Sequence, residues 1–331
     1  MAEPVSPATE PNRSDRRAEL MLGALASVVL VVIVGMVVFV LTKAWPSFAH
    51  NGLAWFGGGG NVDDQLIAIF NSPADPAKYV YTMHAWPLLY ATALVTLGAV
   101  AIGLSFALFA AIFIVEFAPN RIRALLEPVV RLLAAVPSVI YGLIGILVLV
   151  PFVGNHVITR GTKESVAYVV QLSGSSLIVA VVVLTVMITP IMIALIVDAL
   201  RAVPGSWTEG AHALGANRWR VVWTIAVRAA RPAIVGACVL ATARALGEAI
   251  MLSMVSGSVG FSPNPLDGLT FFVEPMRPLA ATIVDNAEGL SVKPLGQTLY
   301  AFAAVLLVSS LFLSLGAWAV RQPMKRYGVR P

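Results

Sequence analysis

The stretch "PAIVGACVLATARALGEAIMLSMVSGSVGFSPNPL" (residues 232–266) contains only two charged side chains, Arg244 and Glu248. A helix of roughly 20 residues spans the hydrocarbon core of a bilayer, so this stretch is long enough to cross a membrane. A charge near the membrane midplane costs at least about 2.5–3.5 kcal/mol and normally faces a bundle interior or a water-filled cavity. The stretch therefore predicts a membrane-spanning segment that carries a polar site.

The whole chain has the composition of an integral membrane protein. Of its 331 residues, 58% are hydrophobic and 12% are charged, with a mean hydropathy of +0.85, whereas roughly a quarter of the residues of a soluble domain are charged. Five further long runs are free of Asp, Glu, Lys and Arg. Together these runs predict an all-α, polytopic membrane protein with six transmembrane helices, at about 22–42, 86–115, 132–152, 176–198, 232–256 and 297–320.

The runs also divide the chain into segments. The apolar part of the first run exceeds the roughly 7–15 residues of a signal-peptide core, so we expect a retained first helix at 22–42 after a cytoplasmic tail at 1–21. Next come an extracytoplasmic loop at 43–85 and a five-helix core at 86–320, with a cytoplasmic loop at 199–231. A second cytoplasmic tail covers 321–331.

The basic residues orient these helices. Six spans place both termini on one side, and 15 of the 22 Lys and Arg residues fall on that side, 6 fall on the other and Arg244 lies in the membrane. Because Lys and Arg accumulate in cytoplasmic segments, we expect both termini in the cytoplasm. The net charge of +5 is then a topology signal that requires no nucleic-acid partner.

One cytoplasmic loop, "VPGSWTEGAHALGANRWRVVWTIAVRAARP" (203–232), contains the pattern of a short capped helix. Ser206 and Glu209 have the spacing of a capping box, and Gly215 is placed for a left-handed cap. Trp207, Ala211 and Leu214 share one face. Such a helix is suited to a groove on another protein; the alternative is a helix that lies on the lipid surface.

The same loop resembles a known family. "EGAHALG" followed by nine residues and Ile225 is similar to the conserved loop of ATP-binding-cassette (ABC) importer permeases, with Gly210 and Arg228 departing from the usual Ala and Pro. This resemblance implies that Ser206, Trp207, Glu209, Ala211, Leu214 and Gly215 form a coupling helix that docks on a separate ATPase subunit.

Two longer stretches narrow the resemblance. "EFAPNRIRALLEPVVRLLAAVPSVIYGLIGILVLVPF" (116–152) and "ARPAIVGACVLATARALGEAIMLSMVSG" (230–257) resemble the PstC-type permease of the phosphate-specific ABC importer. The resemblance implies a type I ABC importer fold in a bacterial inner membrane. It also implies a PstA-type sister permease, two ATPase subunits that bind the ATP, an extracytoplasmic phosphate-binding protein and no cofactor in this chain.

Within this resemblance, Arg244 and Glu248 are candidate residues of the substrate path. Pro232 to Arg244 is 12 residues, or about 18 Å of helix, and Glu248 follows one turn later, where the two side chains can meet. A guanidinium binds phosphate oxygens through two parallel hydrogen bonds. Glu248 would hold Arg244 in an empty path and select protonated oxyanions by repelling others. The alternative is an internal ion pair without a transport role.

Other activities lack their motifs in this sequence. There is no P-loop for ATP, no H-E-x-x-H and no pair of His residues with metal-ligand spacing among His50, His84, His156 and His212. We therefore expect no catalytic residue and no metal site. A permease for sulfate or molybdate remains an alternative, as does an ion-coupled secondary transporter, although that class has internally repeated halves and we find no convincing repeat.

Overall fold

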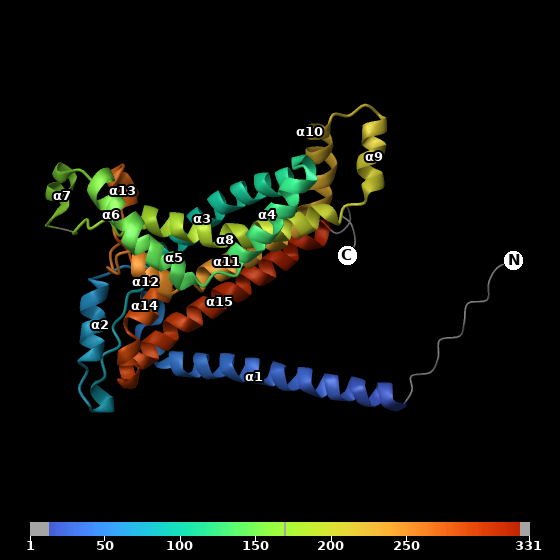
Figure 1. Ribbon diagram of the computed structural model, residues 1–331. Helices are drawn as coiled ribbons and strands as arrows, with labels where there is room; N and C mark the ends of the chain where they lie inside the picture. Colours follow the sequence, from blue (N-terminus) through green and yellow to red (C-terminus); the bar gives the residue numbers. More distant parts are fainter. Residues whose placement is uncertain (1–12, 169, 325–331) are drawn as a thin grey trace.

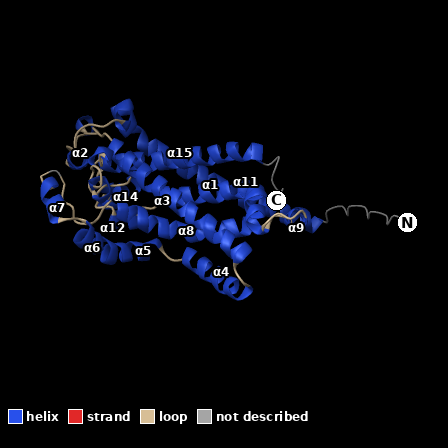
Figure 2. Ribbon diagram, turned by 90° about the horizontal axis from the view of Figure 1, so that it is seen from above, coloured by secondary structure: helices blue, strands red, loops and turns tan. Residues whose placement is uncertain are grey.

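The computed structural model describes residues 13–168 and 170–324. The regular secondary structure of these residues is helical, and they contain no β-strand. Figures 1 and 2 show a bundle of long helices with shorter ones at both ends. The α-helices are α1 Arg13–Asn51, α2 Val62–Phe70, α3 Trp86–Ile112, α4 Asn120–Ala134, α5 Ser138–Ile144, α6 Val150–Phe152, α7 Arg160–Val166, α8 Leu177–Arg201, α9 Gly205–Ala213, α10 Arg218–Val221, α11 Val227–Leu246, α12 Ile250–Val255, α13 Thr270–Val273, α14 Leu279–Asp285 and α15 Lys293–Met324. Single π-helical turns, η3 Phe113–Phe117, η4 Gly145–Leu149, η5 Val153–Val157 and η6 Val222–Ala226, extend or join several of them.

Six helical segments in the described part of the chain are long and apolar enough to cross a membrane, which confirms the predicted number. They cover Arg16–Phe56, Trp86–Phe117, Ser138–Val157, Leu177–Arg201, Arg218–Leu246 and Lys293–Val320. The third segment begins at Ser138 and not at 132, because a separate helix, α4, ends at Ala134. Pro137 favours an extended conformation at Val136 and so separates the two helices.

Helices α3 and α8 form the centre of the bundle, and small residues explain how closely they approach. The buried side of α3 carries a small or β-branched residue at every fourth position: Ala91, Val95, Ala99, Gly103, Ala107 and Ala111. A Cβ added at Gly103 would lie 2.7 Å from Met192 Cε and 3.1 Å from Thr189 Oγ1 of α8. Small residues at fixed spacing let membrane helices pack backbone to backbone, so this spacing sets the α3–α8 contact.

Helix α4 is an amphipathic helix that packs across the end of α8. The Arg123 guanidinium donates to the carbonyls of Ile114 (2.9 Å) and Val115 (2.6 Å) in η3. Arg201 at the end of α8 forms an ion pair with Glu127, and this hydrogen bond holds the pKa of the Glu127 carboxyl below its usual value. The charged residues of α4 thus fix it to the bundle, while much of its apolar side remains exposed.

Helix α1 leaves the rest of the bundle, as Figure 1 shows. Its last turns pack against α15 and the loop helices, where Trp55 and Phe302 are buried with their ring centroids 5.8 Å apart. Every side chain from Arg16 to Met36 is exposed. The α1 helix extends to Asn51, beyond the predicted end at residue 42. Its turns at 43–51 are stabilised because they pack against a second hydrophobic core, which contains Trp55 and Phe302.

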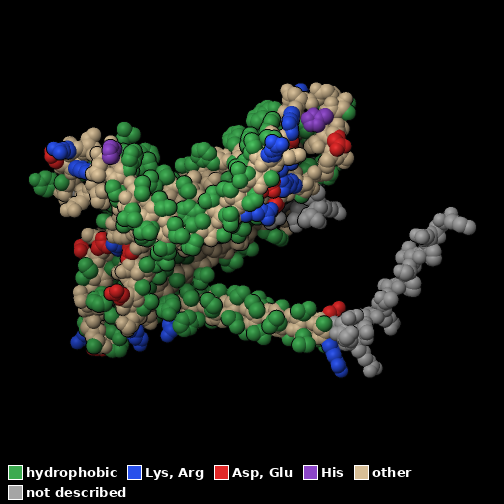
Figure 3. Space-filling model, in the orientation of Figure 1, with side chains coloured by type: hydrophobic (Ala, Val, Ile, Leu, Met, Phe, Trp, Pro, Cys, Tyr) green, Lys and Arg blue, Asp and Glu red, His purple; other side chains and the backbone are tan. Residues whose placement is uncertain are grey.

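The two ends of the bundle differ in charge. Helix α9, the end of α15 and the start of α1 lie toward one end, whereas α2, α7 and α13 lie toward the other. Lys and Arg side chains gather near α4 and α10 at the α9 end (Figure 3). The arrangement puts the predicted coupling helix and both described chain ends on the same side.

Candidate functional site

The fifth span is broken next to the predicted substrate-path residues. Helix α11 ends at Leu246 and α12 begins at Ile250, so the predicted continuous helix at 232–256 is wrong. Gly247 closes α11 with its N–H bonded to Ala243 O and Ala245 O. Arg244 therefore lies in the last turn of α11, and Glu248 lies in the connection between the two helices.

The break separates the two charges. The hydrogen bonds and ion pairs of the described residues include none between Arg244 and Glu248, so the predicted pair is absent from this structure. The Glu248 Oε1 atom instead accepts from the Met251 N–H at 3.3 Å, in the first turn of α12. Glu248 is buried, whereas Arg244 is exposed. Because α11 ends at Leu246, Arg244 and Glu248 are no longer one helical turn apart on the same face. The Glu248 carboxylate instead caps the first turn of α12.

Helix α12 is packed tightly against α5. A Cβ added at Gly142 would lie 3.1 Å from Met251 Cα, and one added at Gly145 would lie 2.6 Å from Val255 Cγ1. The Ser176 N–H at the start of α8 donates to Val255 O at 3.2 Å. The last part of the predicted span at 232–256 is thus a short separate helix, which its neighbours hold more than α11 does.

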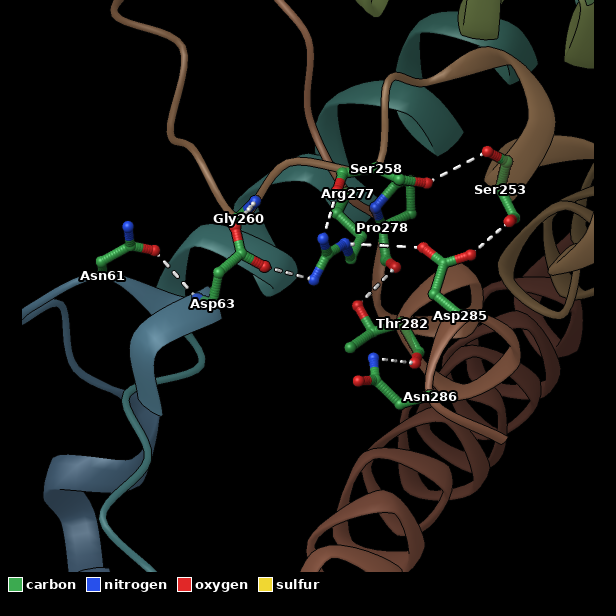
Figure 4. A network of polar contacts seen from close by, with 10 residues as sticks. All are labelled: Asn61, Asp63, Ser253, Ser258, Gly260, Arg277, Pro278, Thr282, Asp285 and Asn286. Atoms are coloured by element: carbon green, nitrogen blue, oxygen red, sulfur yellow. Dashed lines mark hydrogen bonds and ion pairs between the residues drawn. The ribbon is translucent and has the colours of Figure 1, made fainter. Parts of the chain in front are cut away.

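A cluster centred on Arg277 anchors the far end of α12, as Figure 4 shows. Arg277 Nη1 lies 2.6 Å from Asp63 Oδ1 of α2, its Nε lies 3.5 Å from Asp285 Oδ2 of α14, and its Nη2 donates to Ser258 O. Asp285 also accepts from the Ser253 hydroxyl of α12. One guanidinium, with its side chain 11% exposed, therefore ties together three segments that are distant in sequence.

The sequence did not identify the Arg277 cluster. No motif in the loop at 43–85 or in residues 257–296 indicates a contact between the two segments. A weak signal exists, because Arg277 is the only Lys or Arg between residues 245 and 292, a stretch that contains Asp267, Glu274, Asp285 and Glu288. Pairing with Asp63 depends on the tertiary fold and has no local signature.

Glu274 is a second buried ionisable side chain, three residues before Arg277. Its side chain is 3% exposed, and its Oε2 atom has no hydrogen-bond partner. Burial raises the pKa of this carboxyl, and the nearby Asp267 raises it further. The backbone of Glu274 takes part in the fold as well, because its carbonyl accepts from Leu177 N at the start of α8.

Helix α9 projects from the opposite end of the bundle. Gly215 has φ +81°, and its N–H donates to His212 O at 2.9 Å while the Ala216 N–H donates to Ala211 O at 3.1 Å. These two bonds form the left-handed helix ending known as a Schellman motif, which confirms the predicted role of Gly215 as a cap. The expected N-cap is wrong: Pro204 precedes the helix, Gly205 starts it, and Ser206 lies within its first turn without a capping bond.

Much of the apolar face of α9 is exposed to solvent. Trp207 is 45% exposed and Leu214 is 91% exposed, and no residue of α9 is buried. Ala211 is half-buried and Glu209 is exposed. The C-terminal end of the helix is therefore fixed by its cap, while its apolar face is available to pack against another molecule.

Comparisons with known proteins agree with this architecture. The family model of the "binding-protein-dependent transport system inner membrane component" matches residues 99–322. The chain is 34% identical to "Probable ABC transporter permease protein YqgH" of Bacillus subtilis, covering 76% of this chain and 74% of that protein. It is 31% identical to "Phosphate transport system permease protein PstC 1" of Mycobacterium tuberculosis, covering 89% of this chain and 90% of that protein.

Solved structures show the same fold at low sequence identity. A chain of a bacterial alginate ABC transporter, in complex with an alginate-bound periplasmic protein, matches with a TM-score of 0.58 at 14% identity, covering 97% of this chain and all of that one. A chain of the MetNI methionine ABC transporter in an inward-facing conformation matches with a TM-score of 0.52 at 17% identity, covering 72% and 96% of the two chains.

Proposed function

The chain belongs to the family of binding-protein-dependent transport system inner membrane components, and we propose that it moves inorganic phosphate into the cytoplasm as the PstC-type subunit of an ATP-driven importer. Membership makes it a multi-pass inner-membrane permease of an ABC importer. The choice of phosphate is supported by relatives named as PstC at about 30% identity over most of the chain.

The proposal includes partners at both ends of the bundle. In it, a PstA-type sister permease lies beside this chain, two ATPase subunits carry the ATP, and an extracytoplasmic phosphate-binding protein delivers the substrate. The chain itself needs no cofactor or metal. Both termini lie in the cytoplasm in this arrangement, on the side of α9, where basic residues gather.

Helix α9 is the proposed docking element for an ATPase subunit. Trp207 and Leu214 expose an apolar face, and the Gly215 cap leads within three residues to α10, which starts the fifth span. A displacement of α9 would therefore be transmitted directly to the helix that carries Arg244. Rigid-body motions of this kind switch transporters between two accessible states.

Arg244 carries the proposed substrate path. Its guanidinium is exposed in the isolated chain, and the described ion pairs leave it without a carboxylate. Arg244 lies in the last turn of α11, about 18 Å of uninterrupted helix beyond Pro232. A cation at this depth is stable where it faces water or an anion, and its planar set of donors fits phosphate oxygens.

Glu248 has a changed role in this proposal. Its Oε1 atom holds the start of α12 through Met251 N, and no ion pair of the described residues joins it to Arg244. The Oε2 atom can still accept a hydrogen bond from the hydroxyl of hydrogen phosphate, whereas sulfate has no O–H to donate at neutral pH. This difference would favour phosphate over sulfate through an unfavourable contact with the wrong ion.

The test is ATP-driven uptake of radiolabelled phosphate into proteoliposomes that contain the chain with its partners. Wild type is compared with Arg244→Gln and Glu248→Gln, and with Arg160→Gln as a control at an exposed site on α7. Assembly and ATPase activity are recorded for each variant. We expect Arg244→Gln to assemble and to lose most uptake, and Glu248→Gln to become sensitive to competing sulfate.

Two results would contradict the proposal at different levels. Normal phosphate uptake by Arg244→Gln would remove Arg244 from the path but leave the transporter assignment intact. If the wild type imports sulfate or molybdate but no phosphate, the substrate is a different oxyanion.

A further inference from the structure

A row of exposed phenylalanines follows one face of α3 and of η3, the turn that continues it toward the α9 end. Phe106, Phe109, Phe113 and Phe117 are 66%, 56%, 46% and 40% exposed. Their spacing of three and four residues keeps them on one side of the helix. They form a continuous apolar track that ends where the span ends, and the substrate path proposed above does not use them.

The part of this track that lies farther from α9, at Phe106, borders an apolar groove. The groove has a volume of about 520 Å³ and lies between α3, α8 and the last turn of α4. Its lining is apolar except for two threonines, and Thr185 Oγ1 and Thr189 Oγ1 are bonded to carbonyls of their own helix. The lining residues are Ile102, Phe106, Ala110, Leu133, Val182, Thr185, Val186, Thr189, Pro190 and Ile193.

At the α9 end, the track ends in a corner formed by aromatic rings and a cation. The Phe109 ring lies 6.2 Å from Trp223, Trp223 lies 5.6 Å from Trp219, and Trp219 lies 6.3 Å from Phe117. The Arg218 guanidinium lies over the Phe117 ring, 5.1 Å from its centroid. Trp219 is 53% exposed and the Arg218 side chain is 56% exposed, so the corner is open to a ligand.

Arg218 retains donors for an anion. Its ion pair with Glu116 is long, with Nε 3.9 Å from Oε2, near the limit for such a contact. The exposed guanidinium can therefore still bind a phosphate oxygen. Tryptophan beside a cation is also the pattern that membrane proteins place at the level of the lipid headgroups.

The dimensions of the track agree with one lipid leaflet. Ile102 and Phe117 are 15 residues apart, or about 22 Å along a helix. Half of a bilayer, including its headgroup region, is about 20–22 Å thick. The order along this distance, an apolar groove, then aromatic rings, then a cation, is the order of acyl chain, interface and headgroup in a phospholipid.

We propose that this face of α3 binds an anionic phospholipid, with one acyl chain in the groove and the headgroup phosphate at Arg218. The leaflet is the one at the α9 end, which is the cytoplasmic leaflet in the proposed orientation. Because α10 follows α9 closely, the bound lipid supports the segment that connects the coupling helix to the fifth span.

The experiment is native mass spectrometry of the intact transporter, purified in detergent and incubated with equal amounts of phosphatidylglycerol and phosphatidylcholine. Wild type is compared with Arg218→Gln, with Arg160→Gln as a matched loss of an exposed arginine at the opposite end, and with the groove-filling variants Ala110→Trp and Val186→Trp. Val186 is 53% exposed, so the larger side chain at this site does not have to displace the core.

We expect the wild type to retain phosphatidylglycerol in preference to phosphatidylcholine. One arginine near an anionic headgroup changes the affinity by about fivefold, so Arg218→Gln should lower phosphatidylglycerol retention by about that factor and Arg160→Gln should not. Filling the groove should lower the retention of both lipids. These readouts are independent of phosphate transport.

Two outcomes would overturn the proposal. One is phosphatidylglycerol retention by Arg218→Gln equal to that of Arg160→Gln. The other is loss of the second permease subunit from both groove-filled complexes with bound lipid unchanged, which would show that a protein helix covers this face.

Discussion

Replacing Arg277 by methionine should destabilise the end of the bundle opposite α9 more than any other single loss of an exposed or half-buried charge. The change removes contacts with Asp63, Asp285 and Ser258 O in one step. It also leaves two carboxylates facing each other, with side chains 33% and 19% exposed. Methionine keeps the length and the apolar part of the side chain.

The size of the effect follows from this partial burial. Removing one partner of a fully buried ion pair costs about 3–5 kcal/mol, and solvent at Asp63 reduces that cost, so we expect about 2–4 kcal/mol. With an unfolding entropy of about 2.1 cal/mol/K per residue, this loss corresponds to roughly 3–6 °C in the unfolding midpoint of a 331-residue chain. The assay is thermal unfolding of the detergent-purified chain, followed by tryptophan fluorescence, with the exposed Arg220→Met as a control expected within about 0.5 kcal/mol.

A double variant tests whether Arg277 and Asp285 are energetically coupled. If Asp285→Asn is added to Arg277→Met, the second change should cost at least about 1 kcal/mol less than it does alone, because contacting residues are coupled. Equal midpoints for Arg277→Met and Arg220→Met, or strictly additive effects in the double variant, would show that the Arg277 cluster does not hold the segments together.

Three further predictions concern other parts of the chain. Gly215→Val forces a β-branched residue into φ +81°, which costs about 1–2 kcal/mol, and should reduce co-purification of the ATPase subunit; an unchanged ratio of subunits would contradict the docking role of α9. Gly145→Val places a side chain 2.6 Å from Val255 Cγ1 and should destabilise the chain by about 1–3 kcal/mol, measured as a lower unfolding midpoint than that of Gly161→Val, where nothing lies within 4 Å. Burial raises the pKa of Glu274 above the usual 4.5 in the folded state, so its protonated form contributes stability that is complete below pH 4.5 and is lost as the pH rises through the raised pKa. Glu274→Gln should therefore raise the unfolding midpoint at pH 8 and flatten its pH dependence relative to wild type; equal pH profiles would exclude Glu274 as the titrating group.

Several features of the fold and site were accessible from local sequence. The six spans follow from uncharged runs, because any such run of about 20 residues must be withdrawn from water. The ending of α9 at Gly215 was also predictable, because a left-handed cap depends on a few neighbouring residues. Helix α4 was missed because its charged residues removed it from the uncharged runs, although they are the groups that fix it to η3 and α8.

Whether Arg244 pairs with Glu248 could not be predicted from their spacing in the sequence. Their spacing predicts a helical pair, and an isolated continuous helix would permit it. The structure ends that helix at Leu246 because α12 is held elsewhere, by Gly142 of α5, by Gly145 of η4 and by Ser253 on Asp285. Whether two neighbouring residues pair is therefore decided by contacts that neither residue makes.

The sequence by itself determined the membrane class, the number of spans, the family and the short exposed helix α9, because each depends on composition or on residues close together in the chain. Only the tertiary structure decided the break in the fifth span, the Arg277 cluster and the lipid-sized track on α3. The amide of Gly260 reaches the carboxylate of Asp63 across 197 positions. Packing energy is gained only when such distant segments meet, so no local pattern records which of them will do so.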